Sequence, residues 1–508
     1  MSQPDHPAAT RDTTQPIPTR TIQKWFYAFC SFHFLLWFLV PSLVRQNLRV
    51  DSLEALTWGH MWQLGYNKHP PLSAWLTTAF TNFFGTVGWP VYLLSQISVL
   101  ACFWAVWKLG NRFLQPVHTF IGIVMLEGIY YYTVASPQFN PNVPMLGLWA
   151  LTILCFYHAL LTQRWRYWFG VGVFAGLAMM AKYESGLLYG AMLFTLLVTP
   201  QGRQSFKKIG LYGAIIVGFL IFLPNLIWLF HHHFIAVTYA DHRIDQDNLG
   251  LWSHVLDRII HPFNFTLEQL GALAPMLLFY IPFYTAQRQR YALNKFDKRS
   301  LYYMALGPSC CILLFSAVLG AWLHALWAFP LFSLLGIFWT AWHQPIVTRK
   351  RLHSFIGIAG FIMVLTVSVR FIAVAYWPYF TGKTFLNQFP GQIMAERLTD
   401  LWHQRYHRPV PYVAGARYYV ENTAVFSPDH PKPFFEWSTS QSAWINPADM
   451  RKQGAIFAWL APCGKLPNNI ARQYPGVEYL TPQKFRYLTH APIAPVTICV
   501  AFLPPKNN

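Results

Sequence analysis

The chain has 508 residues, of which 54% are hydrophobic, 18% are aromatic and 11% are charged. Soluble domains carry roughly 25% charged residues, so this composition excludes a soluble protein, and the modest Pro, Gly and Cys contents exclude fibrous, disordered and disulfide-framework classes. The sequence therefore indicates an integral membrane protein. It has 38 basic and 19 acidic residues. This excess of positive charge is expected if basic cytoplasmic loops set the orientation of the protein in the membrane, and if anionic lipids or phosphates are its ligands. We expect membrane lipids, and no nucleic acid, as partners.

The predicted elements begin with a polar, disordered cytoplasmic tail at residues 1–21. Residues 22–376 follow as a transmembrane domain, because apolar stretches recur throughout it and a crossing takes roughly 20 such residues. We expect a polytopic α-helical protein with 11–13 transmembrane helices. The apolar stretches lie near residues 25–44, 71–86, 89–107, 113–135, 144–162, 167–181, 185–199, 209–230, 269–286, 301–318, 321–341 and 353–376.

Basic residues mark one side of the membrane as cytoplasmic. They are Arg164, Arg166, Arg203, Lys207, Lys208, the segment 288–299, Arg349, Lys350 and Arg351. This orientation requires that the stretch 71–86, which opens with His-Pro-Pro and is rich in Thr, does not cross fully. The opposite, periplasmic side then receives the loops 45–70 and 231–268 and everything after about residue 377.

Residues 377–508 contain no spanning segment. Short apolar runs such as Tyr412–Ala414 and Ala455–Trp459 alternate with turn residues there, which predicts a soluble α/β domain on the periplasmic face. Cys463 and Cys499 both fall in this oxidising compartment, so they form either a disulfide or two free thiols.

The first outer loop carries the clearest candidate for chemistry. Asp51 and Glu54 are three residues apart, so both carboxylates would face the same side of a helix. Near Lys68 and His69 such a pair suits a catalytic base and its orienting partner. The alternative is structural: Asp51 caps a helix and Glu54 completes a capping box.

Two further clusters carry polar groups at the ends of apolar stretches. Asn140 and Asn142 flank Pro141, and either bind sugar hydroxyls or form a turn. The run Lys182-Tyr183-Glu184 interrupts an apolar stretch, where ionisable residues are costly and usually functional. We expect Lys182 to bind phosphate.

The loop beginning at His231 contains three adjacent His, but consecutive helical residues point about 100° apart and cannot all ligate one ion. His242 and Arg243, further along, are better candidates for binding an anionic group, since Arg offers a bidentate fork to phosphate. The chain shows no zinc, Walker or serine-hydrolase motif, and we assign no metal ligand.

The residues Gly65-Tyr66, His69-Pro70-Pro71-Leu72 and the Gly-Leu-Ala helix from Gly176 to Lys182 resemble glycosyltransferase family 39 of the GT-C superfamily. This family is related to protein O-mannosyltransferases and lipid A aminoarabinose transferases. The C-terminal region is similar to a bacterial branch that decorates lipopolysaccharide with sugars such as galacturonic acid. That similarity is carried by Phe389-Pro390-Gly391, Tyr412-Val413-Ala414-Gly415, Phe426-Ser427-Pro428 and Ser442-Ala443-Trp444.

The resemblance implies an inverting enzyme of the bacterial inner membrane that uses a polyprenyl-phosphate-linked sugar, such as an undecaprenyl phosphate derivative, as donor. Lipid A or core oligosaccharide is the implied acceptor. By position Asp51 is the catalytic residue and Glu54 the runner-up. The donor phosphate would lie among Lys68, His69, Lys182, His242 and Arg243. The substrates would contact Tyr66, Asn140, Asn142, Tyr183 and Glu184. The family allows a divalent metal without requiring one.

Two positions depart from the family pattern. Asp51 and Glu54 are separated where many members have adjacent Asp-Glu, and Asn142 replaces a second-loop acid. Three alternatives stay open: a protein O-glycosyltransferase, a transporter or flippase of lipid-linked sugars, and a non-catalytic assembly partner.

Overall fold

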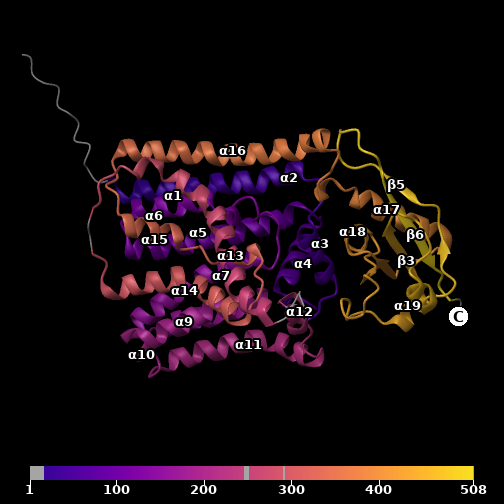
Figure 1. The fold of residues 1–508 in the computed structure, drawn as a ribbon, viewed down its shortest axis with the longest axis horizontal. Coiled ribbons are helices and arrows are strands. Elements are labelled where there is room, and N and C mark those ends of the chain that lie inside the picture. The colour runs from indigo at the N-terminus through magenta and orange to yellow at the C-terminus, as the bar shows by residue number, and fades with distance from the viewer. Residues whose placement is uncertain (1–16, 245–250, 290–291, 507–508) are drawn as a thin grey trace, which may run out of the picture.

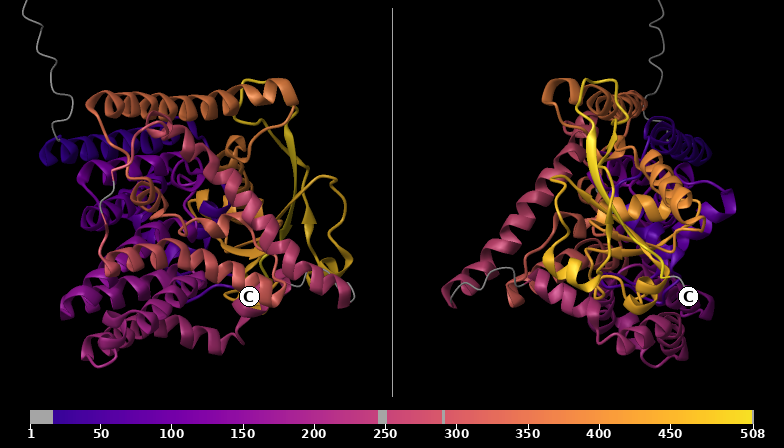
Figure 2. Two further views of the ribbon diagram at one scale, coloured as in Figure 1. Left: turned by 60° about the vertical axis from the view of Figure 1, so that its left-hand side comes forward. Right: turned by 90° about the vertical axis from the view of Figure 1, so that its right-hand side faces the viewer.

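The computed structural model describes residues 17–244, 251–289 and 292–506, with side chains described up to 239 and again from 255. Long helices run roughly side by side, and a small α/β unit sits at one end of them (Figure 1). In the right-hand view of Figure 2, turned by 90°, the sheet unit faces the viewer in front of the helices. The predicted class, a helical membrane protein with a C-terminal α/β unit, is confirmed.

Each predicted apolar stretch contains a helix. The first is a continuous rod of α1 (Thr19–Phe34), a π-helical turn (Leu35–Leu39) and α2 (Val40–Val44). The others that precede the C-terminal unit are α3 (Val50–His60), α4 (Leu72–Phe84), α5 (Trp89–Phe113), α6 (Pro116–Val124), α7 (Asn142–Thr162), α8 (Trp165–Ala181), α9 (Gly186–Val198), α10 (Pro200–Ser205), α11 (Ile209–His231), α12 (Ile235–Ile244), α13 (Leu251–Phe279), α14 (Lys295–Leu319), α15 (Leu335–His343) and α16 (Arg349–Thr381).

Six helical segments in the described ranges are long and apolar enough to cross a membrane. They are Thr19–Val44, Trp89–Phe113, Asn142–Thr162, Ile209–His231, Lys295–Leu319 and Arg349–Thr381. The remaining predicted stretches form shorter or less apolar helices. Among these, α4 has 13 residues and a rise of 1.5 Å per residue makes it about 20 Å long. That length is below the roughly 30 Å of a hydrocarbon core, in keeping with the expectation that 71–86 does not cross fully.

Some predicted boundaries differ from the structure. The expected loop 231–268 is largely helical, since α12 and α13 occupy most of it, and α16 continues past the expected end at 376 to Thr381. Both segments mix apolar and polar residues at helical spacing. Hydropathy alone therefore does not mark them as helical, and the helices extend further than it predicts. The expected disordered tail 1–21 lies mostly outside the described residues, and its last residues belong to α1.

The C-terminal unit is a six-stranded mixed sheet with helices. Its strands are β1 (Tyr412–Gly415), β2 (Lys432–Phe435), β3 (Ala455–Leu460), β4 (Glu478–Tyr479), β5 (Gln483–Phe485) and β6 (Val496–Leu503). Its helices are α17 (Gly391–Tyr406), α18 (Arg417–Phe426), α19 (Pro447–Gln453) and α20 (Asn468–Gln473). Strand β1 lies between β2 and β3 and pairs in parallel with both, while β3 and β6 are antiparallel. Strands at both predicted apolar runs are confirmed, and Cys463 and Cys499 form a disulfide.

The sheet unit meets the helical bundle through α18, which packs against α3. Asn47, just before α3, donates hydrogen bonds to the Phe389 carbonyl (3.1 Å) and to Asn422 Oδ1 (2.9 Å) on α18. These contacts hold α3 between the bundle and the sheet (Figure 1).

Candidate functional site

The carboxylates of Asp51 and Glu54 both lie in the first turns of α3. This helix begins at Val50, its N-cap is Arg49, and no side chain caps it. The capping-box alternative is therefore wrong, because Asp51 is already inside the helix. Ser52 Oγ donates to the Phe139 carbonyl (3.0 Å), which brings the start of α3 against the loop that carries Asn140.

Glu54 is fixed between two cations. Lys68 Nζ donates to Glu54 Oε1 at 2.8 Å, and Arg417 of α18 pairs with the same carboxylate. Burial alone would raise the pKa of the Glu54 carboxyl, but Arg417 and Lys68 lower that pKa overall below 4.5. A carboxylate with a lowered pKa and two salt bridges is a weak proton acceptor. Glu54 is therefore better suited to holding Lys68 in position than to acting as a base.

Asp51 has a different environment. Burial and the nearby charge of Glu54 raise the pKa of its carboxyl, while Lys68, Arg49 and a hydrogen bond from Asn140 act in the opposite direction. Asp51 forms no ion pair within 4 Å with any other described residue. A raised pKa strengthens a carboxylate as a base, so the geometry favours Asp51 over Glu54.

A cavity of about 440 Å³ opens at Lys68, the partner of Glu54, and we call it the lysine cavity. Its polar wall comprises Lys68, His69, Lys182, Tyr183, Glu184, Tyr239 and His324, and its apolar wall comprises Leu187, Ala236, Ile312, Phe315, Trp322 and Trp327, with Gly186 completing the lining. The residues come from the first outer loop, the α8–α9 junction, α12, α14 and the segment that follows α14. An apolar cavity with a few converging polar groups is the usual form of a ligand site.

Lys182 points into the lysine cavity from the end of α8. Its ammonium donates to Asn142 Oδ1 (2.8 Å) and pairs with Glu184. Lys carries three donors, so one remains for a ligand. The ammonium also lies 5.6 Å from the ring centre of Trp327. The predicted members of this cluster, Asn142, Lys182, Tyr183 and Glu184, are therefore brought together.

Enclosure by the protein lowers the pKa of His69 to about 3, and the adjacent charge of Lys182 acts in the same direction. At neutral pH the imidazole is uncharged, so it can offer a ligand a hydrogen bond but no positive charge. Lys68 and Lys182 supply the charge of this wall.

Two predicted residues serve the framework of the site. The Tyr66 hydroxyl donates to the Trp58 carbonyl at 2.6 Å, and its ring stacks on Trp58 with centroids 4.8 Å apart. Asn140 Oδ1 accepts from the Asn142 backbone N–H at 2.9 Å, so the turn interpretation holds for Asn140 even though its side chain also reaches Asp51. His242 and Arg243 lie outside the residues whose side chains are described.

Gly65 explains why the first loop lies over the cavity. A Cβ at this position would come within 2.4 Å of the Trp228 ring on α11, so only glycine allows the loop to approach this closely. Asn225 Nδ2, also on α11, donates to the Leu64 carbonyl at 2.8 Å. These contacts place Lys68 and His69 at the cavity wall.

Arg417 and Glu421 belong to the site but could not be predicted from spacing. Arg417 Nε donates to Glu421 Oε1 at 2.9 Å, while Nη2 of the same guanidinium pairs with Glu54. The side chain of Glu421 is 0% exposed, and burial raises its pKa to about 8 despite the nearby Arg417. One guanidinium thus joins carboxylates of two separate parts of the chain.

The residues present do not fit a divalent metal. Such cations need several free oxygen ligands, whereas Glu54 is engaged by two cations and Asp51 is flanked by Arg49 and Lys68. Within the described ranges, no group of three His, Cys, Asp or Glu side chains is close enough to hold an ion.

Comparison with known proteins supports the resemblance inferred from the motifs. A family model described as dolichyl-phosphate-mannose-protein mannosyltransferase matches residues 68–228. The lipid A galacturonosyltransferase RgtD of Rhizobium johnstonii is 26% identical over 254 residues, which are 48% of this chain and 51% of that protein. The alignment thus spans about half the length of the curated relative.

The fold is that of a solved membrane protein. ArnT from Cupriavidus metallidurans bound to undecaprenyl phosphate superposes with a TM-score of 0.64 over 94% of this chain and 98% of that chain, at 12% identity. Its apo state gives a TM-score of 0.59 with the same coverage. At this identity the likeness establishes the shared fold alone.

Proposed function

We propose that this chain is a membrane glycosyltransferase that moves a sugar from a polyprenyl-phosphate-linked donor to lipid A or the core oligosaccharide of lipopolysaccharide. The observation that carries the proposal is the lysine cavity, which combines two cations with apolar walls and whose Lys68 acts electrostatically on the Asp51 carboxylate. A phosphate joined to a long apolar chain has the matching chemistry. The fold is shared with a protein that binds undecaprenyl phosphate, and a sequence relative transfers galacturonic acid to lipid A, as their names state.

In this mechanism the donor phosphate lies against Lys68 and Lys182, with its polyprenyl chain along the apolar wall. Asp51 takes the proton from an acceptor hydroxyl as its oxygen attacks the anomeric carbon. The bond between that carbon and the phosphate oxygen breaks, and polyprenyl phosphate leaves with inversion. The two lysines stabilise the charge that develops on the leaving group, a contribution that is often the largest in catalysis. A phosphate leaving group requires no general acid.

The sidedness of the reaction is part of the proposal. The site and the sheet unit lie at the end of the bundle away from the basic segments, and a disulfide joins Cys463 to Cys499. Disulfides persist in oxidising compartments, and basic loops stay in the cytoplasm. Both support an active site on the periplasmic side of an inner membrane.

Transfer to a protein is the second candidate, because the matching family model describes a protein mannosyltransferase. A transporter is less well supported, since its charged residues should line a pathway near the bilayer midplane. Among the described residues, His33 and Glu127 form an ion pair inside the helical bundle. Their side chains are only 0% and 1% exposed, so this pair does not line an open pathway.

The direct test is transfer by the purified full chain in nanodiscs, supplied with undecaprenyl-phosphate-linked galacturonic acid and lipid A, with products identified by mass spectrometry. We expect one added sugar on lipid A with the wild-type chain and none with Asp51→Asn. Asp400→Asn, an exposed carboxylate on α17, is the matched control and should retain activity. A peptide that takes the sugar while lipid A does not would replace the lipid acceptor with a protein.

A further inference from the structure

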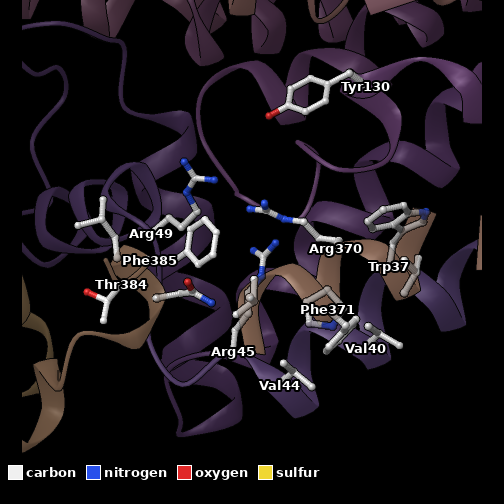
Figure 3. A pocket seen from close by; sticks show the side chains of 15 residues that line it. Trp37, Val40, Val44, Arg45, Arg49, Tyr130, Arg370, Phe371, Thr384 and Phe385 are labelled. Carbon is white, nitrogen blue, oxygen red and sulfur yellow. The ribbon is translucent and has the colours of Figure 1, made fainter. Parts of the chain in front are cut away.

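A second cavity, of about 430 Å³, lies at the outer end of the first membrane helix. We call it the arginine cavity, because the guanidinium groups of Arg45, Arg49 and Arg370 gather around it (Figure 3). Arg45 ends α2, Arg49 precedes α3, and Arg370 comes from α16. The proposed reaction does not use these three residues.

None of the three guanidinium groups forms an ion pair with an acidic side chain in the described part of the chain. The lining contains no Asp or Glu, and the ion pairs of the described residues involve none of the three. Arg370 Nε is buried without a hydrogen-bond partner. Burial lowers the pKa of Arg45, and Arg370 and Arg49 lower it further, although Tyr92 acts against them. Uncompensated buried charge is unfavourable, so an anion here would relieve the repulsion.

The depth of the cavity points to an amphiphile. Arg370 lies 21 residues after Arg349, the start of α16, and a rise of 1.5 Å per residue puts it about 30 Å away, roughly one hydrocarbon thickness. It therefore reaches the interface opposite the basic segment. Trp37, Val44 and Phe371 add an apolar wall to the same cavity. An anionic head group with an acyl chain fits this combination.

The arginine cavity also adjoins the proposed catalytic carboxylate. Arg49 lies two residues before Asp51 and lowers the pKa of its carboxyl, as Lys68 of the lysine cavity does. In Figure 1, α2 and α16 lie on one side of α3, while α12 and α11 lie on the other. One residue of each cavity, Arg49 and Lys68, thus acts on the Asp51 carboxylate.

We propose that the arginine cavity binds a phosphate of the acceptor lipid A, so that acceptor and donor approach Asp51 from opposite sides of α3. The inference rests on the proposed function for the identity of the lipid. The arginine cavity would recognise the anionic head group of a lipid, and bulk phospholipids also carry such a group. The experiment must therefore separate the two sources.

Binding without turnover tests the site directly. The full chain in phosphatidylcholine nanodiscs is titrated with bisphosphorylated lipid A and, separately, with enzymatically dephosphorylated lipid A. We expect the wild-type chain to bind the phosphorylated form at least tenfold more tightly, Arg370→Gln and Arg45→Gln to lose that preference, and Arg370→Lys to keep most of it. Arg486→Gln, an exposed arginine of the sheet unit, is the control. Unchanged preference in Arg370→Gln would overturn the inference.

A second arm repeats the titration with phosphatidylglycerol in the nanodisc. If that lipid displaces lipid A in proportion to its concentration, the site takes any anionic phospholipid and the acceptor assignment is wrong. Kinetics then separate this inference from the proposed reaction. Arg370→Gln should raise the KM for lipid A about tenfold and leave the KM for donor unchanged. A wild-type chain that binds phosphorylated lipid A selectively but transfers no sugar would contradict the proposed function and leave the binding site standing.

Discussion

Glu54 of α3 and Arg417 of α18 form an ion pair that joins the membrane helices to the sheet unit. The same guanidinium bonds Glu421, and the same carboxylate bonds Lys68 at the wall of the lysine cavity. The sheet unit therefore contributes to the geometry of the site, because Arg417 fixes Glu54 and Glu54 fixes Lys68.

Arg417→Gln should destabilise the chain strongly, because it removes one of the two cations of the buried Glu54 carboxylate and the hydrogen bond to the buried Glu421. Breaking a buried pair costs roughly 3–5 kcal/mol, which a thermal or denaturant melt in detergent would detect. The matched control is Arg405→Gln, since Arg405 pairs with Glu478 on the surface, with side chains 57% and 39% exposed. Surface pairs contribute little. Equal losses in both variants would contradict the role given to Arg417.

Glu421 should make stability fall as the pH rises. Burial raises its pKa to about 8 in the folded chain, from an ordinary 4.5, so between these values the folded state holds a proton that the unfolded state has lost. Stability then decreases with pH across that window. In Glu421→Gln this decrease should disappear. Melts of both chains at pH 5–9 would test this, and parallel pH profiles would show that Glu421 is not the titrating group.

Lys182→Gln should reduce turnover more than it weakens ground-state binding of the donor. Loss of a group that stabilises developing charge typically costs 10²–10³ in kcat. Lys207→Gln, an exposed lysine on the basic side of the bundle, serves as control. Steady-state kinetics with the lipid-linked donor give the measurement, and a rise in KM alone would assign Lys182 to uniform binding.

Asn140→Ala should shift the acidic limb of the activity profile to higher pH. Its side chain hydrogen-bonds the charged form of Asp51 and so lowers the pKa of that carboxyl. Removing the bond raises the pKa further, and activity, which needs the carboxylate, appears only at higher pH. The pH dependence of kcat/KM for both chains tests this. An unshifted limb would mean that a group other than Asp51 titrates there.

The helical class and several parts of the site could be predicted from the sequence because they depend on local pattern. The three-residue spacing of Asp51 and Glu54 put both on one helix, and the motif around Lys68 and the interruption at Lys182 marked the cavity wall. Hydropathy located each membrane helix, although it ended α16 too early.

What could not be predicted depends on tertiary contacts. No spacing relates Glu54 to Arg417, which lies in a different structural unit, and nothing in the sequence gathers Arg45, Arg49 and Arg370 into one cavity. The burial that makes His69 neutral and separates the roles of Asp51 and Glu54 is also a property of the folded chain. The capping alternative failed for a related reason, because helix α3 begins at Val50, two residues earlier than a cap at Asp51 requires.

The most direct test of the account is mass spectrometry of lipid A and core oligosaccharide from a host strain that lacks the chain, carrying no copy, the wild-type copy or an Asp51→Asn copy expressed to equal levels. We predict that one sugar is missing without the chain, returns with the wild type and stays absent with Asp51→Asn. An unchanged lipopolysaccharide profile in the deletion strain would contradict the acceptor, and restoration of the sugar by Asp51→Asn would contradict the catalytic role of that carboxylate.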